Sequence, residues 1–376
     1  PVDPRVLEKM IPFFSENYGN CGSNHHYGWK AKKAIEDART QVADLLSAST
    51  EEILFTSGAT ESDNMAIFGI LNKFDPKDSH VITAGTEHKA VLDPLAAWIK
   101  LGGSVSFLKT NLQGKIDLNE LESSIRPNTR LVTLMHANNE IGTVHPIKQI
   151  GEITRKHNIP FHCDAAQSFG KLPINVNEMN IDLLSFSGHK IYAAKGVGGL
   201  YIRNHNPRII LHPIIYGGGQ EKGLRSGTHN VPGVVGLGEA AKIAKNEMDL
   251  DHQKILRLRN KLKDGLLQNL DQIHINGDPE NFLPGTLHCS FNFCEQEALF
   301  MGISDIACSS GSACSSSIKI SHVLEAIGMH PELAQASIRF AVGRFNTHED
   351  IDFTIKKLVN KVKKLRQLSP TYLMSL

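Results

Sequence analysis

A lysine follows one of the apolar runs of the chain at a position suited to covalent chemistry. Lys190 ends the sequence Ser187, Gly188 and His189 that comes directly after the apolar run 182–186. In an α/β protein, the residues just past a strand lie where ligands bind. Ser, Gly backbone and His groups can bind a phosphate there, while the lysine amine forms a Schiff base with pyridoxal 5'-phosphate. A single lysine at such a place is, by itself, more often a solvated loop residue.

Two further segments strengthen this interpretation. Asp164 ends another apolar run, where a carboxylate can pair with the pyridinium nitrogen of that cofactor and make its ring an electron sink. The alternative role for this residue is a helix N-cap. The segment 56–62 also follows a strand-like run and opens a helix, whose free N–H groups and dipole favour a phosphate. As a bare turn, this third segment has weak specificity.

Together these segments resemble the fold-type I pyridoxal-phosphate enzymes, and most closely the class V aminotransferase-like cysteine desulfurases of the NifS/IscS type. The resemblance extends over nearly the whole chain, in the segments 56–64, 86–88, 138–142, 164–167, 185–190, 225–228, 309–314 and 338–340. It implies that Lys190 is the Schiff-base lysine and Asp164 the pyridinium partner. Gln167 matches a donor to the phenolic oxygen of the cofactor, and His88 matches the imidazole stacked on its ring.

The resemblance also assigns the phosphate site and the assembly. Residues that match the phosphate cup are Ala59, Thr60, Ser187 and His189. Thr228 matches a residue that reaches a phosphate across a dimer interface, so we expect a homodimer. An imidazole such as that of His88 can also move protons near neutral pH. Core packing is the alternative role for His88.

Cys314 distinguishes sulfur transfer from transamination, which needs the lysine and the ring but no thiol. It lies in a segment rich in Ser and Gly, 309–317, that is too rich in these residues to form a firm helix or strand. Cys163, Cys289 and Cys294 lie in β-type apolar runs and are expected to be core thiols, and Cys308 is interpreted as structural. The resemblance implies that Cys314 carries a persulfide.

Arg339 is the candidate for binding the substrate carboxylate. It lies on an otherwise apolar, strand-like run, where an unpaired guanidinium is costly to bury. Its planar fork fits an amino-acid carboxylate with two hydrogen bonds. A structural salt bridge is the alternative. Asn139 could donate to the same carboxylate or to the ring oxygen of the cofactor.

The activity implied is conversion of L-cysteine to L-alanine, with the sulfur passed from Cys314 to an acceptor protein in iron-sulfur assembly, tRNA thiolation or DNA phosphorothioation. A class V aminotransferase, a selenocysteine lyase and a non-catalytic docking platform are the alternatives. Two features depart from the family pattern. The family usually has a strand just before a start such as Pro1, and this sequence does not contain it. The segment from Cys314 to Val323 is slightly shorter than in the iron-sulfur desulfurases.

The elements that position these residues alternate between strand and helix. Strand-like runs are expected at 52–55, 80–83, 104–108, 130–135, 160–163 and 182–186, and helices at 60–71, 89–101, 117–125 and 147–157. This alternation predicts an α/β domain with a mainly parallel sheet. A charged helical stretch, 239–270, leads into a smaller α+β domain. We therefore expect a large cofactor-binding domain at 15–249 and a small domain at 1–14 and 250–376 that carries the cysteine loop.

Composition excludes several other classes of protein. The 376 residues suggest about two domains. No run approaches the roughly 18 apolar residues of a membrane span, and the net charge of +1 argues against direct nucleic-acid binding. The six cysteines include no C-x-x-C pair, and no secretory signal is seen, which favours a reducing cytoplasm. The histidines show no metal-ligand spacing, so no metal is expected. The glycines at 233–238 have the wrong order for a dinucleotide loop.

Overall fold

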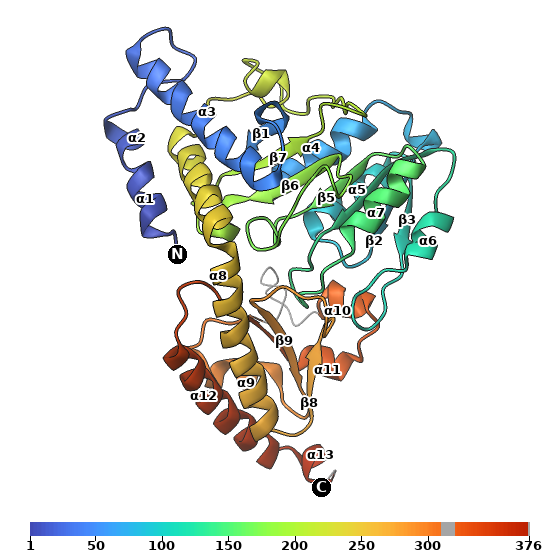
Figure 1. The fold of residues 1–376 in the computed structure, drawn as a ribbon. Helices are drawn as coiled ribbons and strands as arrows, with labels where there is room; N and C mark the ends of the chain where they lie inside the picture. Colours follow the sequence, from blue (N-terminus) through green and yellow to red (C-terminus); the bar gives the residue numbers. More distant parts are fainter. Residues whose placement is uncertain (310–319, 375–376) are drawn as a thin grey trace. The chain divides into compact units, whose positions relative to one another are not determined.

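The computed structural model describes residues 1–309 and 320–374, which divide into two compact units (Figure 1). Unit 1 consists of Pro1–Leu108, Asp117–His136 and His145–Met248. Unit 2 consists of Lys109–Ile116, Ala137–Val144 and the chain from Asp249 onward. The division differs from the expected domains in two ways. Residues 1–14 lie in unit 1, and two short segments from the first half of the chain lie in unit 2.

Unit 1 is built on a seven-stranded sheet with the order β1-β7-β6-β5-β4-β2-β3. Every neighbouring pair is parallel except the two pairs that involve β7. Six of these strands therefore end at the same edge of the sheet. The strands are β1 (Ile53–Thr56), β2 (His80–Ala84), β3 (Ser104–Leu108), β4 (Thr129–Met135), β5 (Phe161–Asp164), β6 (Leu183–Ser187) and β7 (Gly198–Ile202).

Apolar side chains explain why these segments fold as a covered sheet. β1, β2, β5 and β6 are buried at every position, as expected for parallel strands with both faces covered. Helix α4 (Ala59–Leu71) packs against five of the strands, from β4 to β7 and β1. The other helices that lie wholly in this unit are α1 (Pro4–Met10), α2 (Pro12–Ser15), α3 (His26–Leu46), α5 (Lys89–Lys100), α6 (Leu118–Ser123) and α7 (Ile147–Lys156).

Helix α8 (Val231–Asn269) begins eight residues earlier than the expected charged helix. Its first turns contain Gly233, Gly236 and Gly238, the glycines that lack the order of a dinucleotide loop. A Cβ at Gly238 would lie 2.5 Å from the Cα of Ala38 on α3. Glycine here lets two helices approach closely, so packing explains a residue type that disfavours helix in isolation.

Unit 2 contains an antiparallel three-stranded sheet in the order β10-β9-β8. Its strands are β8 (Ile273–Asn276), β9 (Thr286–Phe291) and β10 (Ser337–Ala341), and its helices are α9 (Gln296–Gly302), α10 (His322–Ala326), α11 (Pro331–Gln335), α12 (His348–Gln367) and α13 (Pro370–Leu373). Leu258, Leu287, Ile338 and Leu358 belong to one buried apolar cluster of this unit. The expected fold class, a mainly parallel α/β unit with a smaller α+β unit, is confirmed. None of the helices in the described residues is long and apolar enough to span a membrane.

Candidate active site

The carboxyl ends of β5 and β6 bring two of the predicted site residues together. The two strands are parallel, and Asp164 at the end of β5 pairs in register with Ser185 of β6. β6 ends at Ser187, and a single 3-10 turn, Gly188–Ile191, then carries Lys190. Asp164 and Lys190 therefore both lie at the edge of the sheet where the parallel strands end.

His88 lies just after β2, one of the six strands that end at this edge of the sheet. Its ring lies at the N-cap of α5, where Nδ1 accepts a hydrogen bond of 3.1 Å from the backbone N–H of Ala90. This contact fixes the orientation of the imidazole and leaves Nε2 available, while the side chain as a whole is exposed. His88 is thus held in place by backbone geometry and still open to a ligand.

The electrostatics of Asp164 connect the three residues. Burial raises the pKa of the Asp164 carboxyl, and the N–H of Ala166, which donates to Oδ1 at 2.8 Å, opposes that rise together with the electrostatic effects of His88 and Lys190. An ionised carboxylate at this place would raise the pKa of an adjacent ring nitrogen and favour its protonated form. Gln167 lies in the turn that follows Asp164 and is half-buried.

Two buried acids, to which no role was assigned from the sequence, interact electrostatically with Asp164. Burial raises the pKa of Asp63 on α4 well above its ordinary value, and the charge of Asp164 adds to this rise. Burial likewise raises the pKa of Glu87, whose Oε1 accepts a 2.9 Å hydrogen bond from the N–H of Met135. The sequence signal for these two acids was their place in the segments 56–64 and 86–88, which carry the family resemblance.

A second lysine, Lys171, was also missed. Burial and the charge of Lys190 lower the pKa of Lys171 to about 8. The turn before it contains Gly170, with φ +68°, where a Cβ would lie 2.8 Å from Cγ2 of Ile191. The turn therefore packs against the residue that follows Lys190, and the two amines share one electrostatic environment.

The start of α4 and the end of β6 form a small cradle. Gly58, with φ +152°, precedes Ala59 and Thr60, and a Cβ at Gly58 would lie 3.7 Å from the hydroxyl of Ser187. The same hydroxyl is 2.8 Å from Nδ1 of His189. The first N–H groups of a helix have no partner within the helix and carry its positive dipole end. The cradle is therefore suited to a phosphate, as predicted from the segment 56–62.

An ion pair ties the loop that carries Thr228 to this cradle. Glu61, in the first turn of α4, accepts a 2.7 Å hydrogen bond from Nε of Arg225 and bonds from the N–H and hydroxyl of Ser57. Although burial raises the pKa of Glu61, the hydrogen bonds from Arg225 and Ser57 lower it overall. Thr228, three residues beyond Arg225, is exposed.

In unit 2, the guanidinium of Arg339 contacts neutral oxygens. Nη1 donates to the carbonyl of Asn139 at 2.6 Å, and Nη2 donates to the hydroxyl of Ser309 at 3.0 Å. Within 1–309 and 320–374, no carboxylate forms a salt bridge with Arg339, so the structural salt bridge weighed as an alternative is not seen there. Its charge remains available to a bound anion.

Cys314 lies outside the described residues, but both flanks of its segment are described. The backbones of Ser309 and Arg339 pair through hydrogen bonds of 2.7 and 3.3 Å. On the other flank, Ser321 donates to Glu140 at 2.5 Å, next to Asn139.

The donor set of unit 1 fits pyridoxal 5'-phosphate. A buried carboxylate suits the ring nitrogen, an amine on the adjacent strand end suits the aldehyde, and the glycine-lined cradle suits the phosphate. The φ of +152° at Gly58 is the structural observation that supports this fit, since this conformation favours glycine and leads the chain into α4 beside the hydroxyl of Ser187. Lys190, Asp164 and the start of α4 are the groups that would hold the cofactor.

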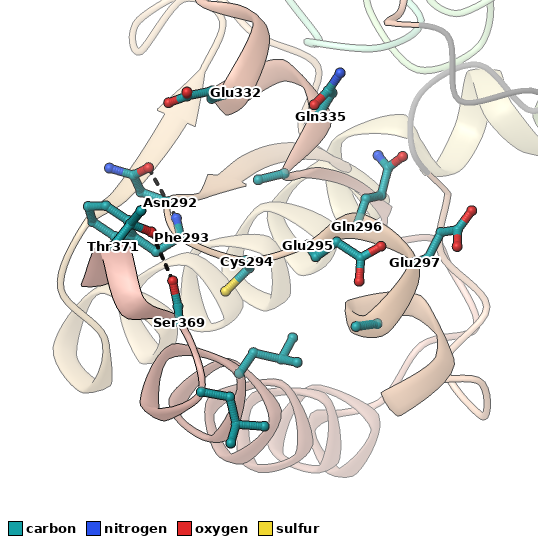
Figure 2. Close-up of a pocket in the computed structure, with 14 residues that line it drawn as sticks. Asn292, Phe293, Cys294, Glu295, Gln296, Glu297, Glu332, Gln335, Ser369 and Thr371 are labelled. Atoms are coloured by element: carbon teal, nitrogen blue, oxygen red, sulfur yellow. Dashed lines mark hydrogen bonds between the residues drawn. The ribbon is translucent and has the colours of Figure 1, made fainter. Parts of the chain in front are cut away.

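A separate pocket of about 770 Å³ lies in unit 2 and contains none of the predicted site residues. Figure 2 shows Cys294 among the side chains that line it, with Glu295, Glu297 and Glu332 around it. No lysine, arginine or histidine lines this pocket. It therefore lacks the cationic groups that a cofactor phosphate requires.

Comparison with known proteins supports one family. The aminotransferase class-V family matches residues 1–353. "Cysteine desulfurase IscS" of Anaeromyxobacter dehalogenans (strain 2CP-C) is 50% identical over 374 residues, which are 99% of this chain and 92% of the relative. A solved structure described as a NifS-like protein has a TM-score of 0.90 and 38% identity, over 96% of each chain. Another, described as SspA in complex with cysteine, has a TM-score of 0.81 and 39% identity, over 92% of this chain and 97% of the other.

Proposed function

The chain belongs to the class-V aminotransferase family and, within it, to the cysteine desulfurases, and we propose on this premise that its substrate is L-cysteine and its products are L-alanine and sulfane sulfur. It is a pyridoxal-phosphate-dependent enzyme. The observation that carries the proposal is the convergence of His88, Asp164 and Lys190, since the charges of His88 and Lys190 both act on the buried carboxyl of Asp164.

The cofactor, when bound, supplies an electron sink that is conjugated to the α-carbon of the substrate. Lys190 would hold it covalently, and Asp164 would keep its ring nitrogen protonated. Gln167 would donate a hydrogen bond to its phenolic oxygen, and His88 would lie against its ring. The residues that would bind its phosphate are Ala59, Thr60, Ser187, His189 and, from the other subunit of a homodimer, Thr228.

Arg339 and Asn139 would bind the substrate carboxylate. The guanidinium of Arg339 is half-buried and, in the described residues, is engaged by neutral oxygens. A carboxylate would add charge-assisted hydrogen bonds that a carbonyl and a hydroxyl do not provide.

Cys314 would take the sulfur. Its thiolate forms a bond to the substrate sulfur while the carbon–sulfur bond breaks, and the electron pair of that bond remains with the carbon skeleton. Lys190 or His88 would remove the α-proton earlier and return protons to carbon, so that alanine leaves. The thiol of Cys314 is left as a persulfide.

The persulfide would then pass to a sulfur-acceptor protein in iron-sulfur assembly, tRNA thiolation or DNA phosphorothioation. We place the protein in the cytoplasm, because six cysteines with no C-x-x-C pair suit a reducing compartment. A net charge of +1 gives the chain little attraction for nucleic acid, so a modified nucleic acid would be contacted by partners.

Absorbance and product analysis test this function together. The purified protein should show the visible absorbance of bound cofactor and should convert L-cysteine to L-alanine, and Lys190→Ala should abolish both. Lys195→Ala is the matched control, because it removes an exposed lysine charge five residues away. Colourless wild-type protein, or cofactor-loaded protein that forms no alanine, would contradict the proposal.

A further inference from the structure

A second thiol is paired with a histidine and a carboxylate, apart from the candidate cofactor site. Sγ of Cys21 lies 3.3 Å from Nδ1 of His229, and Nε2 of His229 lies 2.6 Å from Oε1 of Glu221. Cys21 comes from the segment between α2 and α3, while the other two flank the loop that carries Thr228. All three belong to unit 1, so the fold of one unit assembles this arrangement.

Glu221 is firmly held. It accepts hydrogen bonds of 2.8 and 2.9 Å from the guanidinium of Arg39 and of 2.9 Å from the N–H of Phe55. Burial alone would raise its pKa, but the hydrogen bonds from His229 and Arg39 lower the pKa of Glu221 to about 2. Its backbone has φ +46° and that of Lys222 φ +59°, both in the left-handed region that favours glycine. The carboxylate is therefore ionised and fixed in direction.

This geometry determines which nitrogen of His229 carries a proton. An ionised carboxylate can only accept, so Nε2 carries the hydrogen that Glu221 receives. In the neutral ring, Nδ1 is then the acceptor, and the thiol of Cys21 is its donor. A nucleophile within reach of a base, with the base oriented by a third group, is the general signature of an activated thiol.

The thiol is half-buried and is protonated at rest. Burial raises the pKa of Cys21, and the charge of Glu221 adds to the rise, while Lys32 and Arg39 oppose it. Reaction therefore requires His229 to take the proton as the sulfur attacks. This is a base-assisted thiol and not a permanently ionised one.

The surroundings of Cys21 restrict the chemistry. Acyl transfer needs backbone N–H groups free to stabilise an oxyanion, but the N–H of Gly22 and that of Ser23 both donate to Asn20. Metal binding is not supported either, since the described residues hold no group of three or more metal-ligating side chains suitably placed. Attack on sulfur requires neither an oxyanion hole nor a metal.

We propose that Cys21, with His229 as base and Glu221 as the group that orients it, is a second acceptor of sulfane sulfur from persulfides. The inference rests on the proposed function only for the source of the sulfur. Cys21 gives its proton to His229, and its sulfur attacks the outer sulfur of R–S–S–H. A new S–S bond forms, the original S–S bond breaks, and R–S⁻ leaves with the proton from His229. Cys21 becomes a persulfide and R–SH is released, with no external oxidant or reductant.

The base is tested by alkylation of the cofactor-loaded, full-length protein with iodoacetamide at pH 7, followed at the Cys21 peptide by mass spectrometry. His229→Ala should slow alkylation of Cys21 about tenfold or more. His26→Ala is the matched control, because it removes an exposed imidazole five residues from Cys21 and should change the rate less than twofold. Equal rates in wild type and His229→Ala would overturn the proposal.

Sulfur uptake is tested with glutathione persulfide, which does not depend on the desulfurase reaction. The Cys21 peptide should gain one sulfur atom, and His229→Ala should slow this gain about tenfold. No gain at Cys21 would overturn the proposal whatever the alkylation result. A parallel incubation with L-cysteine measures alanine, so a failure there with normal uptake from glutathione persulfide counts against the proposed desulfurase and in favour of the Cys21 site.

Discussion

At the scale of single residues, surroundings decide which acid in a cluster can act on a ligand. Asp63, Glu87 and Asp164 are all buried, which raises the pKa of each, and the charge of Asp164 raises the pKa values of the other two further. Of the three, only Asp164 has a pKa that His88 and Lys190 also act to lower. The carboxyl at the strand end is therefore the one whose ionised form its surroundings favour most.

The first prediction concerns the predicted nucleophile. Cys314→Ser should keep the visible absorbance of the cofactor but reduce sulfide release from L-cysteine, with dithiothreitol present, by about a hundredfold or more, because a hydroxyl does not attack sulfur at neutral pH. Cys308→Ser, at the half-buried thiol six residues earlier, is the control and should stay near wild type. Normal sulfide release from Cys314→Ser would instead favour a class V aminotransferase or a selenocysteine lyase.

The second prediction concerns the carboxylate site. Arg339→Ala should raise the KM for L-cysteine about tenfold to a hundredfold, since charge-assisted hydrogen bonds contribute about 1.5–3 kcal/mol. Arg339→Lys keeps the charge without the planar fork, and its KM should lie between those of the wild type and Arg339→Ala. Cofactor content is read from the visible absorbance. A variant that has lost only substrate binding should keep its cofactor, whereas a variant with a disrupted structure near Ser309 should lose it. A KM unchanged in both variants would leave Arg339 with a purely structural role.

At the scale of elements, the ends of the buried strands were predictable, whereas the start of the longest helix was not. β5 and β6 end within one residue of the expected runs, because an apolar run stops where the chain leaves the covered sheet. α8 begins earlier than expected because its glycines disfavour helix locally and are retained for close packing on α3. The triad of Cys21, His229 and Glu221 had no local signal at all, since about 200 residues separate the thiol from its base.

The third prediction concerns the ion pair between Glu61 of α4 and Arg225 in the loop that carries Thr228. Glu61→Gln should lower the free energy of unfolding at pH 7 by at most about 1.5–3 kcal/mol, because it removes the charge that Arg225 and Ser57 bind. Asp37→Asn, in the exposed ion pair with Lys33, is the control and should cost less than about 1 kcal/mol.

The pH dependence gives a second measurement on the same variant. The pKa of Glu61 is lower in the folded protein than its ordinary value of 4.5. Its contribution is therefore present above pH 4.5 and is lost as the pH falls through the lower, folded value. Denaturant unfolding should show the wild-type advantage shrinking in that acidic range. An advantage that persists unchanged below it would mean that the ionised carboxylate is not the stabilising group.

At the scale of the whole chain, the two-unit organisation was predictable, but the membership of short segments was not. Alternating strands and helices, followed by a long charged helix, indicated a large and a small unit. Nothing in 109–116 or 137–144 differs in composition from the surrounding chain, so their place in unit 2 depends on long-range pairing. Thr143, for example, bonds to the N–H of Asp278, 135 residues away. Asn139 therefore belongs to the same unit as Arg339 because of contacts that no local pattern encodes.

Assembly is the remaining property of the whole molecule. We expect a homodimer in which Thr228 binds the cofactor phosphate of the other subunit.

If the phosphate is bound by both chains, cofactor binding and dimerisation strengthen each other by the same free energy. Thr228→Ala should therefore weaken cofactor retention, and removal of the cofactor should shift the monomer–dimer equilibrium towards monomer on dilution. Thr40→Ala, at an exposed threonine of α3, is the control and should change neither. Light scattering over a dilution series, with absorbance read on the same samples, measures both quantities. A monomer that keeps its cofactor and full desulfurase activity at the lowest concentration would refute the shared site.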